Sequence, residues 1–273
     1  MSTFKVTRLG EVITANSIPV GIAANNINGP TVFKRPNYFP AGPEWIMYFA
    51  HHKGNSIRQA TATSVEGPWQ VLPETILELS KIPGHDHIAS PEVVLHETFL
   101  ELYYHCPYRD SQYTFIATTH NGIDWEYNPA AQGMFYMRIL EKDYAIAKYK
   151  NEGGIIYRRS EGAFKEVKRI LPNMRHCAYM EGKLYWSCIG DSPETIFRGD
   201  LDLTTFTVSN IEEVLKPLYN FETGGHTPKP SLPGPATRVN EVRDPYVVKQ
   251  GKISYIFYTV RGEEAIALAK IEE

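Results

Sequence analysis

The sequence predicts an all-β protein that forms a single five-bladed β-propeller. Short runs rich in β-branched and aromatic residues recur between turns that contain Gly, Pro, Asn or Asp, which is typical of strands. Groups of three such runs repeat five times at a spacing of roughly 40–70 residues, and self-similarity at this period indicates a propeller. No amphipathic helical period of about 10–15 residues recurs, which argues against a helix-rich α/β fold.

The whole chain is expected to form one domain, because 273 residues with 42% hydrophobic and 12% aromatic content suffice for one large all-β core. Blades are expected at 26–70, 86–128, 133–168, 174–210 and 241–273. Their strands are expected at 31–33, 45–50, 56–62, 91–95, 99–105, 113–119, 135–140, 143–148, 154–159, 177–180, 183–189, 195–200, 245–248, 252–259 and 265–270. Each blade has room for a fourth strand.

The remaining segments are expected to close the ring and cover one of its faces. A strand at residues 4–7 would complete the last blade, and such closure removes exposed sheet edges. Residues 210–216 read as a helical turn. Residues 223–235 are rich in Gly and Pro, which predicts a long irregular loop.

Composition argues against several functional classes. A net charge of −3 argues against a general binder of nucleic acid or anionic membranes. No apolar run approaches the roughly 20 residues of a membrane span, and residues 1–16 lack the apolar centre of a signal peptide. Three cysteines in strand-like runs predict buried free thiols rather than a disulfide framework. We therefore expect a cytoplasmic protein, monomeric or homodimeric.

Polar residues at the starts of the innermost strands predict a central pocket. In a propeller these strands begin at the axis, and ionised groups are costly to bury without partners or a function. The polar candidates there are Asn28, His87, Ser90, Glu92, Tyr136, Arg138, Arg175, His176, Arg243 and Asp244. The third strand of the first unit adds Arg58, and turns after the second strands add His51, His52, Lys53, His105, Asp191, Arg261 and Glu263.

Asp244 and Glu92 are the first candidate pair of catalytic carboxylates. Glycoside cleavage requires one carboxyl group as acid and another as base or nucleophile. Arg243 beside Asp244 is expected to keep that carboxylate ionised as the base. The apolar surroundings of Glu92 are expected to raise its pKa toward an acid role. Asp86, Asp191 and Glu194 are held in reserve.

The histidines and cations of the expected pocket suit polar ligands rather than a metal. No HExxH or close Cys/His spacing is present, so no metal or cofactor is expected. His52, His87, His105 and His176 suit hydrogen bonding to sugar hydroxyls or a carboxylate. Lys53, Arg58, Arg138 and Arg243 suit an anion such as phosphate or a uronic acid.

Several runs resemble the five-bladed propeller glycosidases, the superfamily of glycoside hydrolase families 43, 32, 62, 68 and 117, and most closely its uncharacterised bacterial members. These runs are Asn28-Gly-Pro-Thr, Tyr48-Phe-Ala-His-His-Lys-Gly, Ile57-Arg58, Gly67-Pro-Trp, His87-Ile-Ala-Ser-Pro-Glu92, Arg175-His176, Ile189-Gly-Asp-Ser-Pro-Glu194, Arg243-Asp-Pro and Gly262-Glu263. The resemblance covers nearly the whole chain and implies a carbohydrate substrate.

The resemblance implies a base Asp in the first blade, a pKa-modulating Asp in the second and an acid Glu in the third. Here Asn28 stands at the first position, Glu92 at the second, and the third blade offers Tyr136 and Arg138. One rotated assignment makes Asp244 the base, Asn28 the modulator and Glu92 the acid. Another makes a histidine the acid, with His52, His87 or His176 in that role, as family 117 would permit.

Three functions remain open on this evidence. The first is a hydrolase that cleaves a glycosidic bond of a short oligosaccharide in the central pocket. The second is a phosphorylase or a lyase on the same fold, with the basic residues holding phosphate or a uronate carboxylate. The third is a propeller that binds sugar without catalysis, which Asn28 favours.

Overall fold

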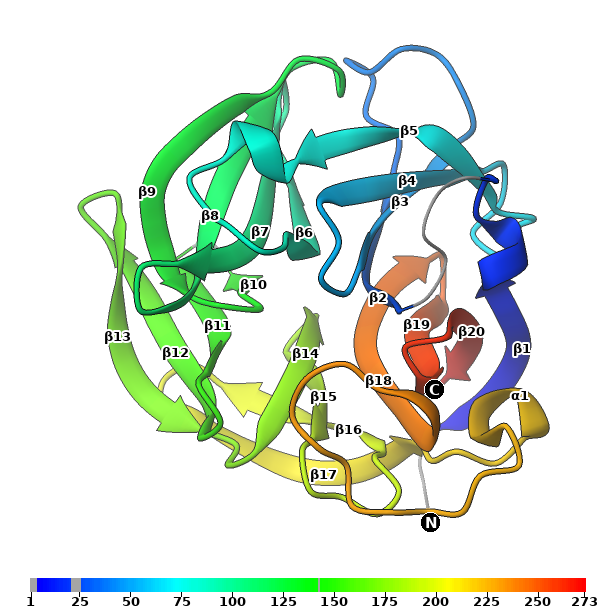
Figure 1. Ribbon diagram of the computed structural model, residues 1–273. Coiled ribbons are helices and arrows are strands. Elements are labelled where there is room, and N and C mark those ends of the chain that lie inside the picture. The colour runs from blue at the N-terminus through cyan, green and yellow to red at the C-terminus, as the bar shows by residue number, and fades with distance from the viewer. Residues whose placement is uncertain (1–3, 21–25, 142) are drawn as a thin grey trace.

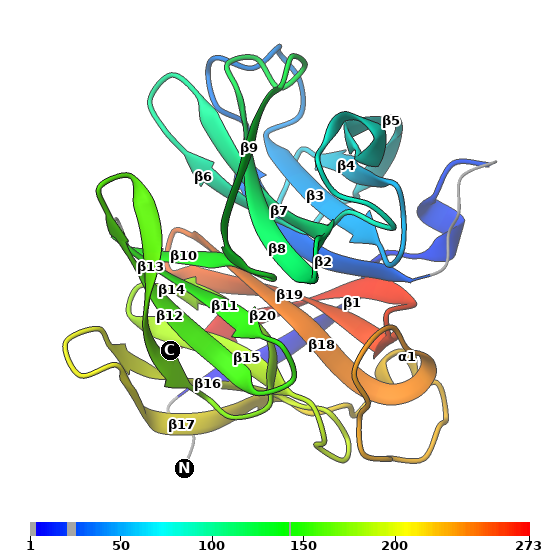
Figure 2. The same cartoon turned by 60° about the vertical axis from the view of Figure 1, so that its left-hand side comes forward.

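The protein is a five-bladed β-propeller, as the computed structural model shows for residues 4–20, 26–141 and 143–273. Five four-stranded antiparallel sheets surround a central axis, and their innermost strands meet there (Figures 1 and 2). The predicted fold class is therefore confirmed.

The first two blades follow the chain outward from the axis. The first contains β2 (Ile27–Lys34), β3 (Trp45–His51), β4 (Ser56–Ala62) and β5 (Gln70–Glu78). The second contains β6 (Ala89–Leu95), β7 (Leu100–Tyr108), β8 (Ser111–Thr119) and β9 (Glu126–Met134). Short 3-10 helices lie at Ala15–Ser17 and Leu79–Lys81.

The third and fourth blades repeat this plan. The third contains β10 (Arg138–Glu141), β11 (Tyr144–Tyr149), β12 (Gly153–Ser160) and β13 (Ala163–Ile170). The fourth contains β14 (Met174–Met180), β15 (Lys183–Cys188), β16 (Ile196–Asp202) and β17 (Thr207–Leu215).

The last blade joins the two ends of the chain. It contains β18 (Thr237–Gln250), β19 (Ile253–Gly262), β20 (Ala265–Glu272) and β1 (Lys5–Ile13). β1 pairs antiparallel with β20, from Lys5 opposite Glu272 to Ile13 opposite Ile266. The N-terminal strand thus closes the ring, and it is longer than the expected strand at residues 4–7.

The expectation of a helical turn at 210–216 is wrong. Ile211 and Val214 have helical spacing, but this segment belongs to β17 and pairs with β16, so tertiary pairing overrides the local pattern. The short helix α1 (Asn220–Thr223) follows it, and the loop to β18 crosses one face of the ring (Figure 1). No helix in the described ranges has the length and apolar character needed to cross a membrane.

Apolar side chains pack between neighbouring blades rather than at the axis. Trp45 and Phe49 of the first blade, for example, share one cluster with Phe257 and Leu268 of the last. Alternate residues of each strand point to opposite faces, so each sheet buries both of its faces against the adjacent sheets. The axis is left to the polar starts of the innermost strands.

The innermost strands depart from regular geometry where they reach the axis. Gly29, Ser90, Tyr136 and Asp244 have φ values of 55°, 50°, 59° and 47°, the left-handed region that non-glycine residues rarely adopt. The pairing register shifts beside Gly29, Ser90 and Asp244. For the three non-glycine residues such a conformation costs about 1–3 kcal/mol, and conformations of this kind concentrate at functional sites. They turn side chains from several blades toward one point.

Candidate active site

Asp244 presents a carboxylate without a hydrogen-bond partner to the centre of the ring. Its side chain is buried, and no hydrogen bond reaches the carboxylate from any described residue. Burial, followed by the nearby charge of Glu263, raises the pKa of Asp244 to about 6. Arg175 and Arg243 act in the opposite direction but are outweighed. The net shift is thus opposite to the one expected from Arg243 alone.

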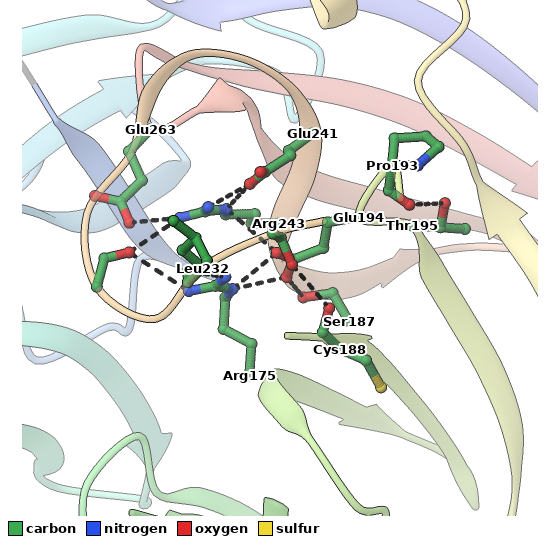
Figure 3. Close-up of polar contacts among 12 residues, drawn as sticks. Arg175, Ser187, Cys188, Pro193, Glu194, Thr195, Leu232, Glu241, Arg243 and Glu263 are labelled. Atoms are coloured by element: carbon green, nitrogen blue, oxygen red, sulfur yellow. Dashed lines mark hydrogen bonds and ion pairs between the residues drawn. The ribbon is translucent and has the colours of Figure 1, made fainter. Parts of the chain in front are cut away.

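Arg243 is held by carboxylates from three segments (Figure 3). It donates from Nε to Glu241 at 2.6 Å, lies 3.4 Å from Oε2 of Glu194 and contacts Oε1 of Glu263 at 3.5 Å. The charge of Arg243 is therefore neutralised inside the protein.

Arg175 shares Glu194 with Arg243 and completes this network. Its Nε donates to Oε1 and Oε2 of Glu194 at 2.7 and 3.0 Å. Ser187 donates a further hydrogen bond to Glu194 at 2.7 Å (Figure 3). Although burial opposes it, this set of partners holds the pKa of Glu194 below its ordinary value. Glu194 is therefore an ionised structural centre between β14, β15 and β18.

The predicted loop at 223–235 is tied to the network by its backbone. Arg175 donates to the Leu232 carbonyl at 2.7 Å, and Arg243 donates to the Gly234 carbonyl at 3.2 Å. The Ser231 side chain accepts a hydrogen bond from the Gly190 amide at 3.0 Å. The Asp191 carbonyl accepts one from the Ser231 amide at 3.0 Å. The loop therefore forms a wall of the site, and Asp191 supports it from the turn after β15.

Asn28 and His52 of the first blade meet Glu263 of the last. The Nδ1 atom of His52 lies 2.9 Å from Oε2 of Glu263, and Nδ2 of Asn28 lies 3.4 Å from the same oxygen. Glu263 follows β19 directly, so this contact spans the point where the ring closes. It places a carboxylate beside the position where the resemblance implies the base Asp.

Three other predicted histidines continue from His52 in a series of ring contacts, in which the His52 and His87 rings are 6.0 Å apart between centroids. The Tyr136 ring is 4.7 Å from that of His105 and 5.1 Å from that of His176, between centroids. His87 lies 5.6 Å from His105 and bonds Asp86 through Nδ1 at 2.7 Å. Burial is the main cause that lowers the pKa of all three histidines, so they are neutral near pH 7.

Glu92 and Arg138 form a buried pair with a separate set of neighbours. Arg138 donates to the carbonyls of Pro91 and Cys177 and to Nε2 of His176, at 3.0, 3.2 and 3.0 Å. Its Nη1 lies 3.5 Å from Glu92. Burial raises the pKa of Glu92 to about 7, against the opposing charge of Arg138. The predicted upward shift is confirmed, but the role of Glu92 as the acid stays a prediction.

The two remaining predicted cations are placed differently. Arg58 is buried between the first and last blades, and its Nε and Nη1 have no hydrogen-bond partner in the described parts of the chain. Lys53 is exposed at the rim of a cavity of about 560 Å³. His52, His87, Phe135 and Gly234 also line this cavity. The cavity therefore opens beside both the histidine group and the arginine network.

Sequence reasoning gave Glu241 and Glu263 no role in the site and left Lys148 out of it. Glu241 and Glu263 stand within or beside runs that were noted, but their partners are far away in sequence. Lys148 ends the mostly apolar run Tyr-Ala-Ile-Ala-Lys on β11. A charged residue directly after buried strand positions could have marked it as a candidate site residue. It is buried, and burial lowers the pKa of Lys148 to about 8.

The cysteines form no disulfide, and the described residues form no metal-binding group. Cys106, Cys177 and Cys188 are free thiols, of which the first two are buried. Among the described residues, no group of three or more His, Cys, Asp or Glu side chains is arranged to hold a metal ion.

Comparison with known proteins finds a distant relative over most of the chain. No protein-family model matches the chain. The uncharacterized protein R118 of Acanthamoeba polyphaga mimivirus is 28% identical over 298 residues, which cover 90% of this chain and 83% of that protein.

Two solved structures show the likeness in fold. The β-1,2-mannobiose phosphorylase of Listeria innocua superposes with a TM-score of 0.68 and 12% identity, over 98% of this chain and 96% of that one. CoXyl43, a family 43 β-xylosidase/α-arabinofuranosidase from a compost microbial metagenome, gives 0.62 and 11% identity, over 97% and 95%. The chain therefore has the five-bladed propeller fold that glycosidases and glycoside phosphorylases share.

Proposed function

We propose that this protein is a glycosidase that cleaves a glycosidic bond of a short oligosaccharide in the pocket at the propeller axis. The observation that carries the proposal is Asp244. A buried carboxylate without a hydrogen-bond partner, on a strained backbone and with a raised pKa, is costly to fold and suited to proton transfer. The fold shared with glycosidases supports the same conclusion.

Asp244 is assigned the role of base and Glu92 that of acid. Glu92 has the higher pKa, about 7 against about 6, so it retains its proton over a range where Asp244 is ionised. Glu263 is the competing partner, because its charge acts directly on Asp244. Asn28, His52, His105 and His176 are assigned to binding of sugar hydroxyls.

The test is turnover of a panel of neutral and acidic short oligosaccharides by wild-type protein, Asp244→Asn and Asp143→Asn. Asp143 is exposed and makes no side-chain contact with any described residue, so its variant is a matched control. Loss of a general base costs typically 10²–10⁴-fold. Full activity of Asp244→Asn would overturn the assignment, and comparison with Glu92→Gln and Glu263→Gln identifies the second carboxyl group.

The alternative reactions on this fold have distinct products. The likeness to a mannobiose phosphorylase favours phosphorolysis as the second candidate. Turnover that requires inorganic phosphate and yields a sugar phosphate would establish it. A product with ultraviolet absorbance would establish a lyase, and tight binding of an intact glycan without turnover would establish a binding propeller.

The free thiols agree with the proposed cytoplasmic location.

A further inference from the structure

Lys148 is a buried cation without an ion pair among the described residues. Only 4% of its surface is exposed, and its ammonium forms no ion pair or side-chain hydrogen bond with any described residue. Its Nζ atom lies 5.8 Å from the centre of the Phe135 ring, which lines the cavity beside the axis. A ring face is a weak partner for a buried ammonium.

The two arginines whose charges act on Lys148 are bonded to carboxylates of the protein. Arg175 is bonded to Glu194, and Arg243 is bonded to Glu241. Asp244 acts on Lys148 through its charge, but it forms no hydrogen bond to it. A buried charge without a partner is costly, because it loses its hydration and gains no ion pair in return. Lys148 therefore has the properties of a group whose partner arrives with a ligand.

The rim of the cavity that Phe135 lines carries more cations. Lys53, Arg109 and Lys150 line it, are exposed and make no ion pair within the described ranges. The rim also carries two carboxylates, Asp86 and Asp110, which bond His87 and Tyr113 and offset part of this charge. Three cations against two carboxylates leave the rim with a net positive charge, although the chain as a whole has a net charge of −3.

We propose that the sugar bound at the axis carries an anionic group, a carboxylate or a phosphate, and that Lys148 is the residue that pairs with it. This inference rests on the proposed function, because it names the substrate class of the same pocket. It assigns the anion site to Lys148 and the cavity rim, rather than to Arg138 and Arg243, whose guanidinium groups are occupied. A carboxylate and a phosphate ester share the chemistry that an ammonium recognises.

The test is calorimetric titration of the full-length protein with matched monosaccharides. Glucose and galactose are compared with glucuronate and galacturonate, with their 6-phosphates, and with inorganic phosphate. We expect at least one acidic sugar to bind at least tenfold more tightly than its neutral counterpart. We expect Lys148→Met to abolish that preference, Lys148→Arg to retain part of it, and Lys252→Met to leave it intact, since Lys252 is exposed in the turn between β18 and β19.

The outcomes separate the sources of the anion and the two proposals. Preference for a uronate or for a sugar phosphate supports the inference and identifies the anion. Equal binding of neutral and acidic sugars, or binding of inorganic phosphate alone, overturns it. Thermal melting without ligand tests whether Lys148 has a structural role instead. A melting midpoint of Lys148→Met at or above that of the wild type excludes such a role, and a clearly lower midpoint overturns the inference. The proposed function is tested independently, because full turnover by Asp244→Asn would overturn it whatever the binding preference of Lys148.

Discussion

Nδ2 of Asn28 lies 3.4 Å from Oε2 of Glu263, so the last blade places a carboxylate beside the first-blade position where the resemblance implies an aspartate. The two residues are 235 positions apart and meet only because β1 closes the ring onto β20. Asp244 lies near this contact, as the effect of Glu263 on its pKa shows. The acidic group of the site is thus assembled from the end of the chain.

Changing Asn28→Asp would test this arrangement. A second carboxylate beside Glu263 repels it at neutral pH, so we expect the variant to be less stable at pH 8 than at pH 5, relative to wild type. The measurement is the urea midpoint at both pH values. Asn128→Asp is the control, because this exposed residue uses only its Oδ1 acceptor, which is retained. An equal change of the urea midpoint between pH 5 and pH 8 in the two variants would contradict this prediction.

The pH dependence of kcat/KM should report the ionisation of Asp244. With a pKa of about 6, the group is protonated below that pH, so a base role predicts activity that falls as the pH decreases through about 6. Asp143→Asn should retain this acid limb, and any residual activity of Asp244→Asn should lack it. A loss of activity above pH 6 that depends on Asp244 would instead assign it the acid role.

Glu92 should make the protein less stable as the pH rises. Its pKa is raised from 4.5 to about 7 in the folded state, so the folded protein binds the proton more tightly than the unfolded chain does. Glu92 therefore contributes most to the free energy of unfolding below about pH 4.5. This contribution falls by on the order of 3 kcal/mol as the pH rises to about 7. Urea unfolding of wild type and Glu92→Gln at pH 5 and pH 8 measures it. A constant difference between the two proteins would contradict the expectation.

Glu194 should be among the residues on which folding depends most. Its carboxylate pairs with Arg175 and Arg243, and its side chain is fully buried. Removal of one partner from a buried ion pair typically costs about 3–5 kcal/mol, because the other charge remains without compensation. Urea unfolding of Glu194→Gln should show a loss of this size. Glu213→Gln, at an exposed position of β17, should change stability by less than about 0.5 kcal/mol.

Strand order brings several of the predicted site residues together. Asn28, His176, Arg243 and Asp244 all reach the axis, because each stands in an innermost strand. The surroundings of Asp244 and Glu92 could not be predicted from the sequence. Arg138 lies 3.5 Å from Glu92, whereas Asp244 has no hydrogen-bond partner among the described residues. Arg243 was a candidate anion ligand by residue type, but its contacts are with Glu241, Glu194 and Glu263.

The sequence by itself determined the fold class, because the alternation of buried and exposed residues along a strand, and the repetition of strand groups, are local properties of the chain. It also placed Asp244 beside a proline at the start of an innermost strand. Only the tertiary structure decided which charges are paired. Ion pairing depends on distances of a few ångströms between residues on different blades, and closure of the ring by β1 sets those distances. The same closure leaves Lys148 and Asp244 as the charged groups without hydrogen-bonded partners beside the axis, within the described residues.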